Sequence, residues 1–194
     1  MKKLVIKTVG ITLAFIVVFL AITYGVFALF FPKNTAYFYD GLGYDKIAVK
    51  YMMKAYDKSG DIKDLKTLCD YTVKTNDNGL IAEYLGEIFD KNKTEFLAET
   101  GSEYYDAAAS KYINALYEVK EDKSSCVDEA FAVTDKYRKG CAVRSLLGPV
   151  FIKNDEETAL LIKTKLESFL ATASDEEKQI ALSDLNVLTD FLND

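Results

Sequence analysis

The stretch of sequence that decides the fold runs from Thr8 to Phe31 and reads TVGITLAFIVVFLAITYGVFALFF. Its 24 residues include no charged side chain. A helix of this length extends about 36 Å, which is enough to cross the roughly 30 Å hydrocarbon core of a bilayer with some tilt. Apolar residues surround the whole helix, whereas a helix packed on a soluble core usually keeps a polar face. We therefore expect a membrane-spanning helix.

A cleaved signal peptide is the alternative interpretation of this run. Signal peptides usually have an apolar core of about 7–15 residues that ends at a cleavage site with small residues. The nearest such site is Val26-Phe27-Ala28, and cleavage there would leave a strongly apolar new N-terminus. An uncleaved anchor is therefore favoured. It divides the chain into a cytoplasmic tip and transmembrane anchor, residues 1–31, and a helical domain, residues 32–194.

The charges that flank the run predict its orientation. Lys2, Lys3 and Lys7 precede it, and only Lys33 follows closely. The positive-inside rule then keeps the N-terminus in the cytoplasm and places residues 32–194 outside. Nothing in the sequence indicates a eukaryotic secretory host, so we expect a single-pass protein of a bacterial cell membrane.

The composition of the exported part excludes some partners. Without the three N-terminal lysines the chain has 21 basic and 30 acidic residues, a net charge of −9. Nucleic-acid binding is disfavoured because it needs a basic surface that displaces counterions. The 163 residues after the anchor are enough for one compact domain with its own core.

Every strongly periodic stretch after the anchor indicates a helix, because apolar residues recur at alternating spacings of three and four. Ser59-Gly60, the turn from Asn76 to Gly79, and Gly148-Pro149 are the expected helix ends. Asn154 with Glu157, and Ser174 with Glu177, are expected to cap the last two helices. The expected helices cover residues 44–59, 62–75, 81–89, 105–119, 124–137, 142–147, 155–170 and 175–192.

One of these helices carries a family resemblance. The segment from Ala48 to Tyr56, AVKYMMKAY, resembles the second helix of a tetratricopeptide repeat (TPR), in which small and large apolar residues recur at fixed offsets. Tyr56-Asp57-Lys58 returns as Phe89-Asp90-Lys91 after 33 residues, the period of that family. The resemblance covers about residues 33–92. Met52 is matched by Gly86, which departs from the family pattern, and a look-alike array of helical hairpins is the alternative.

The resemblance implies stacked helical hairpins. The expected fold class is therefore all-α, with a single N-terminal transmembrane helix followed by a helical-hairpin array of the TPR-like or α-solenoid type.

The chain contains no recognisable reaction centre. It has no histidine, which removes Ser-His and Cys-His nucleophile pairs and most zinc sites, and no Gly-rich phosphate loop. Cys69, Cys126 and Cys141 lack the close spacing of a metal or redox pair. A disulfide between Cys126 and Cys141 is disfavoured because the predicted intervening helix separates their ends. We expect no catalytic residues, no metal and no cofactor.

Two classes of function fit these observations. The first is a membrane-anchored helical scaffold or adaptor that binds another protein or peptide at the outer face of the membrane. The second is an envelope hydrolase with paired carboxylates, for which acidic residues between Glu83 and Glu99 are candidates, although their spacing is also that of a solvated face. The scaffold is favoured. Its candidate partner-binding residues, for which core packing is the alternative, are Tyr44, Tyr51, Tyr84 and Tyr105.

Overall fold

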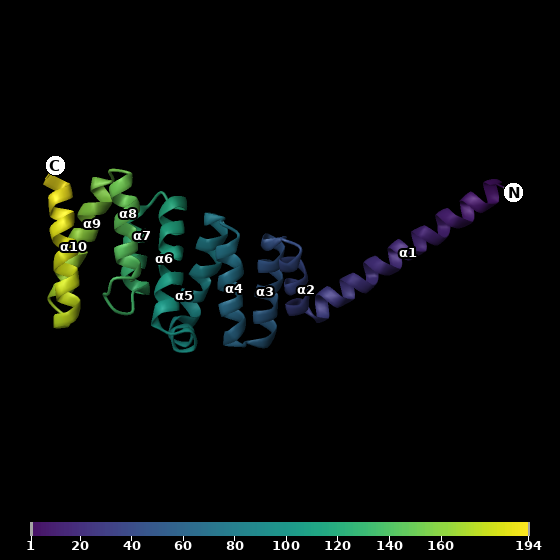
Figure 1. Ribbon diagram of the computed structural model, residues 1–194, viewed down its shortest axis with the longest axis horizontal. Coiled ribbons are helices and arrows are strands. Elements are labelled where there is room, and N and C mark those ends of the chain that lie inside the picture. The colour runs from purple at the N-terminus through teal and green to yellow at the C-terminus, as the bar shows by residue number, and fades with distance from the viewer. Residues whose placement is uncertain (1, 194) are drawn as a thin grey trace. The chain divides into compact units, whose positions relative to one another are not determined.

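The computed structural model describes the backbone of residues 2–193 and the side chains from Thr8 onward. Within that range the chain forms ten α-helices and no strand (Figure 1), so the all-α prediction is confirmed. Its contacts divide the chain into two compact units, Met1–Asp64 and Leu65–Asp194, which are described separately below. This division does not test the predicted boundary after Phe31, which stays a prediction.

Helix α1 spans Lys2–Phe30 and contains the apolar run. Its segment from Thr8 to Phe30 is long and apolar enough to cross a membrane, and almost all of its described side chains are exposed. A signal sequence at this position would meet the same criteria of length and composition.

The rest of the first unit is a helical hairpin. Helix α2, Pro32–Gly41, packs against helix α3, Asp45–Ser59, and small or flexible apolar side chains such as Ala36, Ala48 and Met52 are fully buried. Gly60 ends α3 in the left-handed conformation, with φ of 64°, as the sequence predicted. The unit closes at Asp64, whose carboxylate lies 2.5 Å from the ammonium group of Lys33.

Helices α4, α5 and α6 begin the second unit, to which α4 belongs from Leu65 onward. They span Ile62–Lys74, Asn78–Thr100 and Ser102–Val119. Asp77 caps α5 by accepting hydrogen bonds from the backbone N–H groups of Gly79 and Leu80, which confirms the predicted turn. Helix α5 continues well past the predicted end and changes direction at Asn92, whose φ of −133° is not helical.

Helix α7 spans Lys123–Val133 and ends four residues earlier than predicted. Continuation would pair the carbonyl of Val133 with the N–H of Tyr137. Instead, the hydroxyl of Tyr105 donates to the Val133 carbonyl at 2.6 Å, and the Tyr137 N–H donates to Glu177 at 3.1 Å. Two long-range hydrogen bonds therefore replace the helical one.

Helix α8 spans Ala142–Ile152, so the predicted end at Gly148-Pro149 was wrong. Proline removes one backbone hydrogen bond, but Leu146, Leu147 and Val150 are buried on both sides of Pro149 and hold the last turn in the core. The predicted cap at Asn154 was also wrong. Asn154 adopts a left-handed conformation, with φ of 51°, and closes the end of α8.

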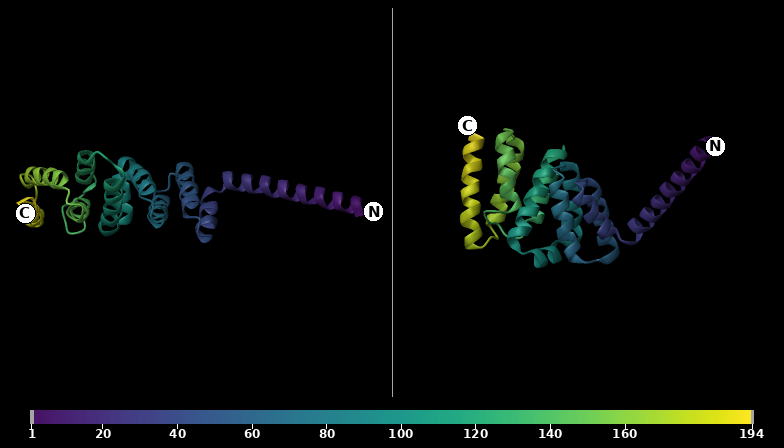
Figure 2. Two further views of the ribbon diagram at one scale, coloured as in Figure 1. Left: turned by 90° about the horizontal axis from the view of Figure 1, so that it is seen from above. Right: turned by 45° about the vertical axis from the view of Figure 1, so that its right-hand side comes forward.

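Helices α9, Glu156–Leu170, and α10, Asp175–Asn193, pack against each other at the C-terminal end of the unit (Figure 2). Asp155 caps α9, with its carboxylate 3.0 Å from the N–H of Thr158. The predicted capping box of α10 is confirmed. The N–H and the hydroxyl of Ser174 both donate to the carboxylate of Glu177, at 3.1 and 2.6 Å.

Candidate functional site

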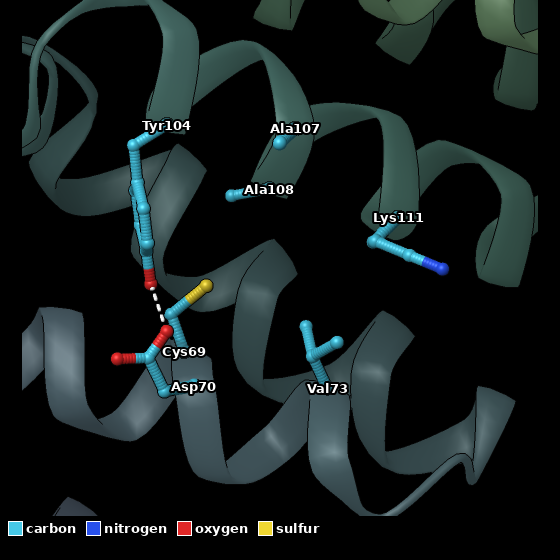
Figure 3. A pocket seen from close by; sticks show the side chains of 7 residues that line it. All are labelled: Cys69, Asp70, Val73, Tyr104, Ala107, Ala108 and Lys111. Atoms are coloured by element: carbon cyan, nitrogen blue, oxygen red, sulfur yellow. Dashed lines mark hydrogen bonds between the residues drawn. The ribbon is translucent and has the colours of Figure 1, made fainter.

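A pocket of about 200 Å³ lies between α4 and α6 in the second unit (Figure 3). Small-molecule sites usually have volumes of about 300–1,000 Å³, so this pocket is better matched to a single side chain of a partner. Val73 from α4 and Ala107 and Ala108 from α6 give it an apolar lining, and Asp70, Tyr104 and Lys111 supply polar groups. We call it the α4–α6 pocket.

The position of Tyr104 in this pocket is fixed by hydrogen bonds. Its hydroxyl donates to Asp70 at 2.6 Å, which Figure 3 shows as a dashed line, and lies 3.3 Å from the carbonyl oxygen of Lys66. The ammonium group of Lys66 lies 5.0 Å from the centre of the Tyr104 ring, within the range of a cation–π contact. Burial raises the pKa of Tyr104, so the hydroxyl stays protonated and remains a donor.

Cys69 lines the same pocket but is only 2% exposed. Burial raises the pKa of its thiol to about 12, which opposes formation of the nucleophilic thiolate. Cys126 and Cys141 are also buried and unpaired, and burial raises the pKa of Cys126 to about 11. All three cysteines are therefore small core residues in this structure.

The four predicted partner-binding tyrosines occupy different environments. Tyr105 is fully buried and takes the alternative role of a core residue. Tyr84 is half-buried on α5, and burial together with Glu83 and Glu87 raises its pKa. Tyr44 is 56% exposed and Tyr51 is half-buried.

Tyr44 and Tyr51 meet at Tyr39, a residue at the end of α2. The ring of Tyr51 stacks on Tyr39 with 5.8 Å between centroids, and the ring of Tyr44 meets Tyr39 edge-on at 6.1 Å. The hydroxyl groups of Tyr39 and Tyr24 lie 2.6 Å apart and share a hydrogen bond. Neighbouring apolar side chains of the same unit are exposed, namely Tyr37, Phe38, Leu42 and Ile47.

A separate polar network joins α6, α8 and α10 to the loop after α7. The guanidinium of Arg138 pairs with the buried carboxylate of Asp106. The hydroxyl of Tyr137 and the guanidinium of Arg144 both donate to the buried Asp184, at 2.8 and 2.7 Å. These side chains satisfy one another, so the network holds the fold together.

The acidic residues of α5 do not face a cleft. The carboxylates with an exposed environment are Glu83, Asp90, Glu95 and Glu99, while Glu87 is half-buried and pairs with Lys91 at 2.5 Å. A second hollow of about 430 Å³ contains Glu176 and Glu177. Hydrogen bonds from Ser174 and from the N–H of Tyr137 lower the pKa of Glu177, whereas a general acid needs a raised pKa.

Among the residues whose side chains are described, no group of three or more cysteine or acidic side chains is arranged to hold a metal ion. The chain matches no family model, and no curated protein or solved structure gives a match. The functional argument therefore rests on the two units themselves.

Sequence reasoning missed the α4–α6 pocket. Cys69, Asp70 and Tyr104 come from helices more than 30 residues apart, and no local pattern joins them. The only signal was the pair Ala107-Ala108, because small residues allow another backbone to approach closely.

Proposed function

We propose that the protein is a membrane-anchored helical scaffold that binds a polypeptide through its second unit, with α1 as the anchor. The α4–α6 pocket is the observation that carries this proposal. It is too small for most metabolites, has an apolar lining for one side chain, and presents a hydroxyl, a carboxylate and an ammonium group at which a backbone or polar group can bind.

The TPR-like interpretation belongs to the same proposal. Helices α3 and α5 begin 33 residues apart, at Asp45 and Asn78, as the repeat period requires. Ala48 and Ile81 occupy buried positions in their respective helices. Arrays of this kind present surfaces along their helices that bind extended segments of other proteins.

The location at the outer face of the membrane is also proposed. It is supported by the length and composition of α1 and by the lysines before it. Tethering would raise the effective concentration of a partner on the same membrane, so that weak binding at a small pocket suffices.

The test fills the pocket without touching its polar groups. Ala107→Trp places a large ring into the lining from an exposed position on α6, and Ala98→Trp on an exposed position of α5 is the matched control. The full chain, extracted in mild detergent after chemical cross-linking in membranes, should carry a specific polypeptide. That cross-link should be lost in Ala107→Trp and kept in Ala98→Trp.

The result also separates the scaffold from the hydrolase. A cross-linked partner that survives Ala107→Trp, or the absence of any partner in the parent chain, would contradict the proposed site. A hydrolase would instead lose activity on envelope material when one carboxylate of a facing pair is replaced.

A further inference from the structure

The end of α1 and the C-terminal half of α3 enclose a pocket of about 280 Å³ within the first unit. Its lining is divided by chemistry. Helix α1 contributes mainly apolar surface, whereas α3 contributes two lysines and an aromatic ring. The residues that matter for the argument are Tyr24, Ala28 and Leu29 from α1, and Tyr51, Lys54 and Lys58 from α3.

Both lysines are held at the end of the apolar helix. The ammonium group of Lys58 donates to the carbonyl of Phe30 at 3.0 Å. The ammonium group of Lys54 lies 5.1 Å from the centre of the Tyr51 ring. Both side chains are exposed, and neither takes part in an ion pair within the described residues. Two positive charges therefore point into the pocket without an acidic partner.

These lysines continue a row along α3. Lys46, Lys50, Lys54 and Lys58 follow one another at intervals of four residues, so they share one face of the helix. Residues 32–64 contain six lysines and five aspartates, whereas residues 65–194 contain 15 basic and 25 acidic residues. The acidic chain thus keeps its positive charge next to the end of the apolar helix.

We propose that this pocket binds an anionic phospholipid of the membrane that α1 crosses. The phosphate lies between the ammonium groups of Lys54 and Lys58, and the glycerol and upper acyl chain lie on Ala28 and Leu29. A spanning helix ends at the level of the lipid headgroups, where lysine and tyrosine side chains are favoured and basic side chains attract anionic lipids. The inference rests on the proposed anchoring of α1 but holds for either orientation.

The experiment uses the full chain reconstituted into vesicles of equal parts phosphatidylglycerol and phosphatidylcholine, followed by native mass spectrometry of the lipids that stay bound. The parent chain should retain phosphatidylglycerol in preference. Lys54→Gln with Lys58→Gln should reduce that preference by roughly 30-fold, and Lys136→Gln with Lys139→Gln, which makes the same charge change on an exposed loop, should leave it unchanged.

A second variant tests the apolar half without changing charge. A side chain at Gly25 has open space, since nothing lies within 4 Å of its added Cβ, so Gly25→Leu fills the pocket without a clash. It should also weaken retention. Equal retention of both lipids by the parent chain, or equal losses in both double lysine variants, would overturn the lipid site. Failure of the chain to insert into vesicles would instead refute the anchor.

Discussion

The three cysteines lie in the core as unpaired thiols, although the sequence places them in a domain expected outside the cytoplasm. We predict that none reacts with a maleimide in the folded protein at pH 8, because burial restricts access and raises each thiol pKa, to about 12 for Cys69 and about 11 for Cys126. All three should react after denaturation. A rapid reaction of any one of them in the folded chain would contradict the structure.

Asp155 combines a helix cap with a long-range contact. Burial disfavours its charge, but hydrogen bonds from Tyr117, at 2.6 Å, and from Thr158 outweigh this and lower its pKa. A lowered folded-state pKa stabilises the fold above the unfolded pKa of about 3.9, and this contribution disappears as the pH falls through the folded pKa.

Asp155→Asn should therefore cost about 1–2 kcal/mol at pH 7 and less at pH 3. Urea unfolding of the full chain in mild detergent at the two pH values measures the difference. An equal cost at both values would show that the charge of Asp155 contributes nothing.

Asp184 connects α10 to α8 and to the loop after α7. We expect Asp184→Asn to destabilise the second unit by about 2–4 kcal/mol, because the partly buried Arg144 loses its counter-charge. Tyr137→Phe removes a single hydrogen bond to the same carboxylate and should cost about 1 kcal/mol. The two unfolding free energies, measured under one condition, check this order, and the reverse order would contradict it.

Helix packing gives a physical reason for one departure from the repeat pattern. A Cβ added at Gly86 on α5 would lie 3.2 Å from the hydroxyl of Tyr112 on α6, so the glycine makes room for that ring. Gly86→Met, which introduces the residue found at position 52, should destabilise by about 1–3 kcal/mol.

Gly148 provides the matched control for this prediction. It is an exposed helical glycine with nothing within 4 Å of an added Cβ, so Gly148→Ala should stabilise by up to about 1 kcal/mol. Thermal unfolding of both variants tests the pair. A tolerated Gly86→Met would mean that Tyr112 moves aside at little cost.

The helices and most of their caps could be predicted from the sequence because these features depend on neighbouring residues. Gly60, Asp77 and the Ser174–Glu177 box act within one helical turn. The end of α7 could not be predicted, because it depends on Tyr105 and Glu177, which are 28 and 40 residues away from their partners. For the same reason Tyr44 and Tyr51 were found only in part, and the α4–α6 pocket was missed.

For the whole chain, the central prediction is that residues 1–31 anchor it. The full chain should stay with membranes after alkaline carbonate extraction, and a chain that begins at Pro32 should be released. Sedimentation and immunoblotting measure this. Release of the full chain would contradict anchoring, and a shortened mature protein would indicate a cleaved signal sequence.

The orientation needs an introduced label because the natural thiols are buried. Lys139→Cys lies in the exposed turn before α8 and should react with an impermeant maleimide from outside intact cells. The parent chain is the control. A reaction that requires permeabilised cells would place the helical units in the cytoplasm.

The contacts that Tyr24 and Lys58 make across the first unit also have a mechanical meaning. Tyr24 bonds to the end of α2, and Lys58 of α3 bonds to the last carbonyl of α1, so the hairpin grips the helix at two points about one and a half turns apart. A helix held in this way cannot turn about its own axis without carrying the hairpin with it. Any torque on the apolar helix, whether from a neighbouring helix or a change in bilayer thickness, would reach Tyr44 and Tyr51 as a rotation.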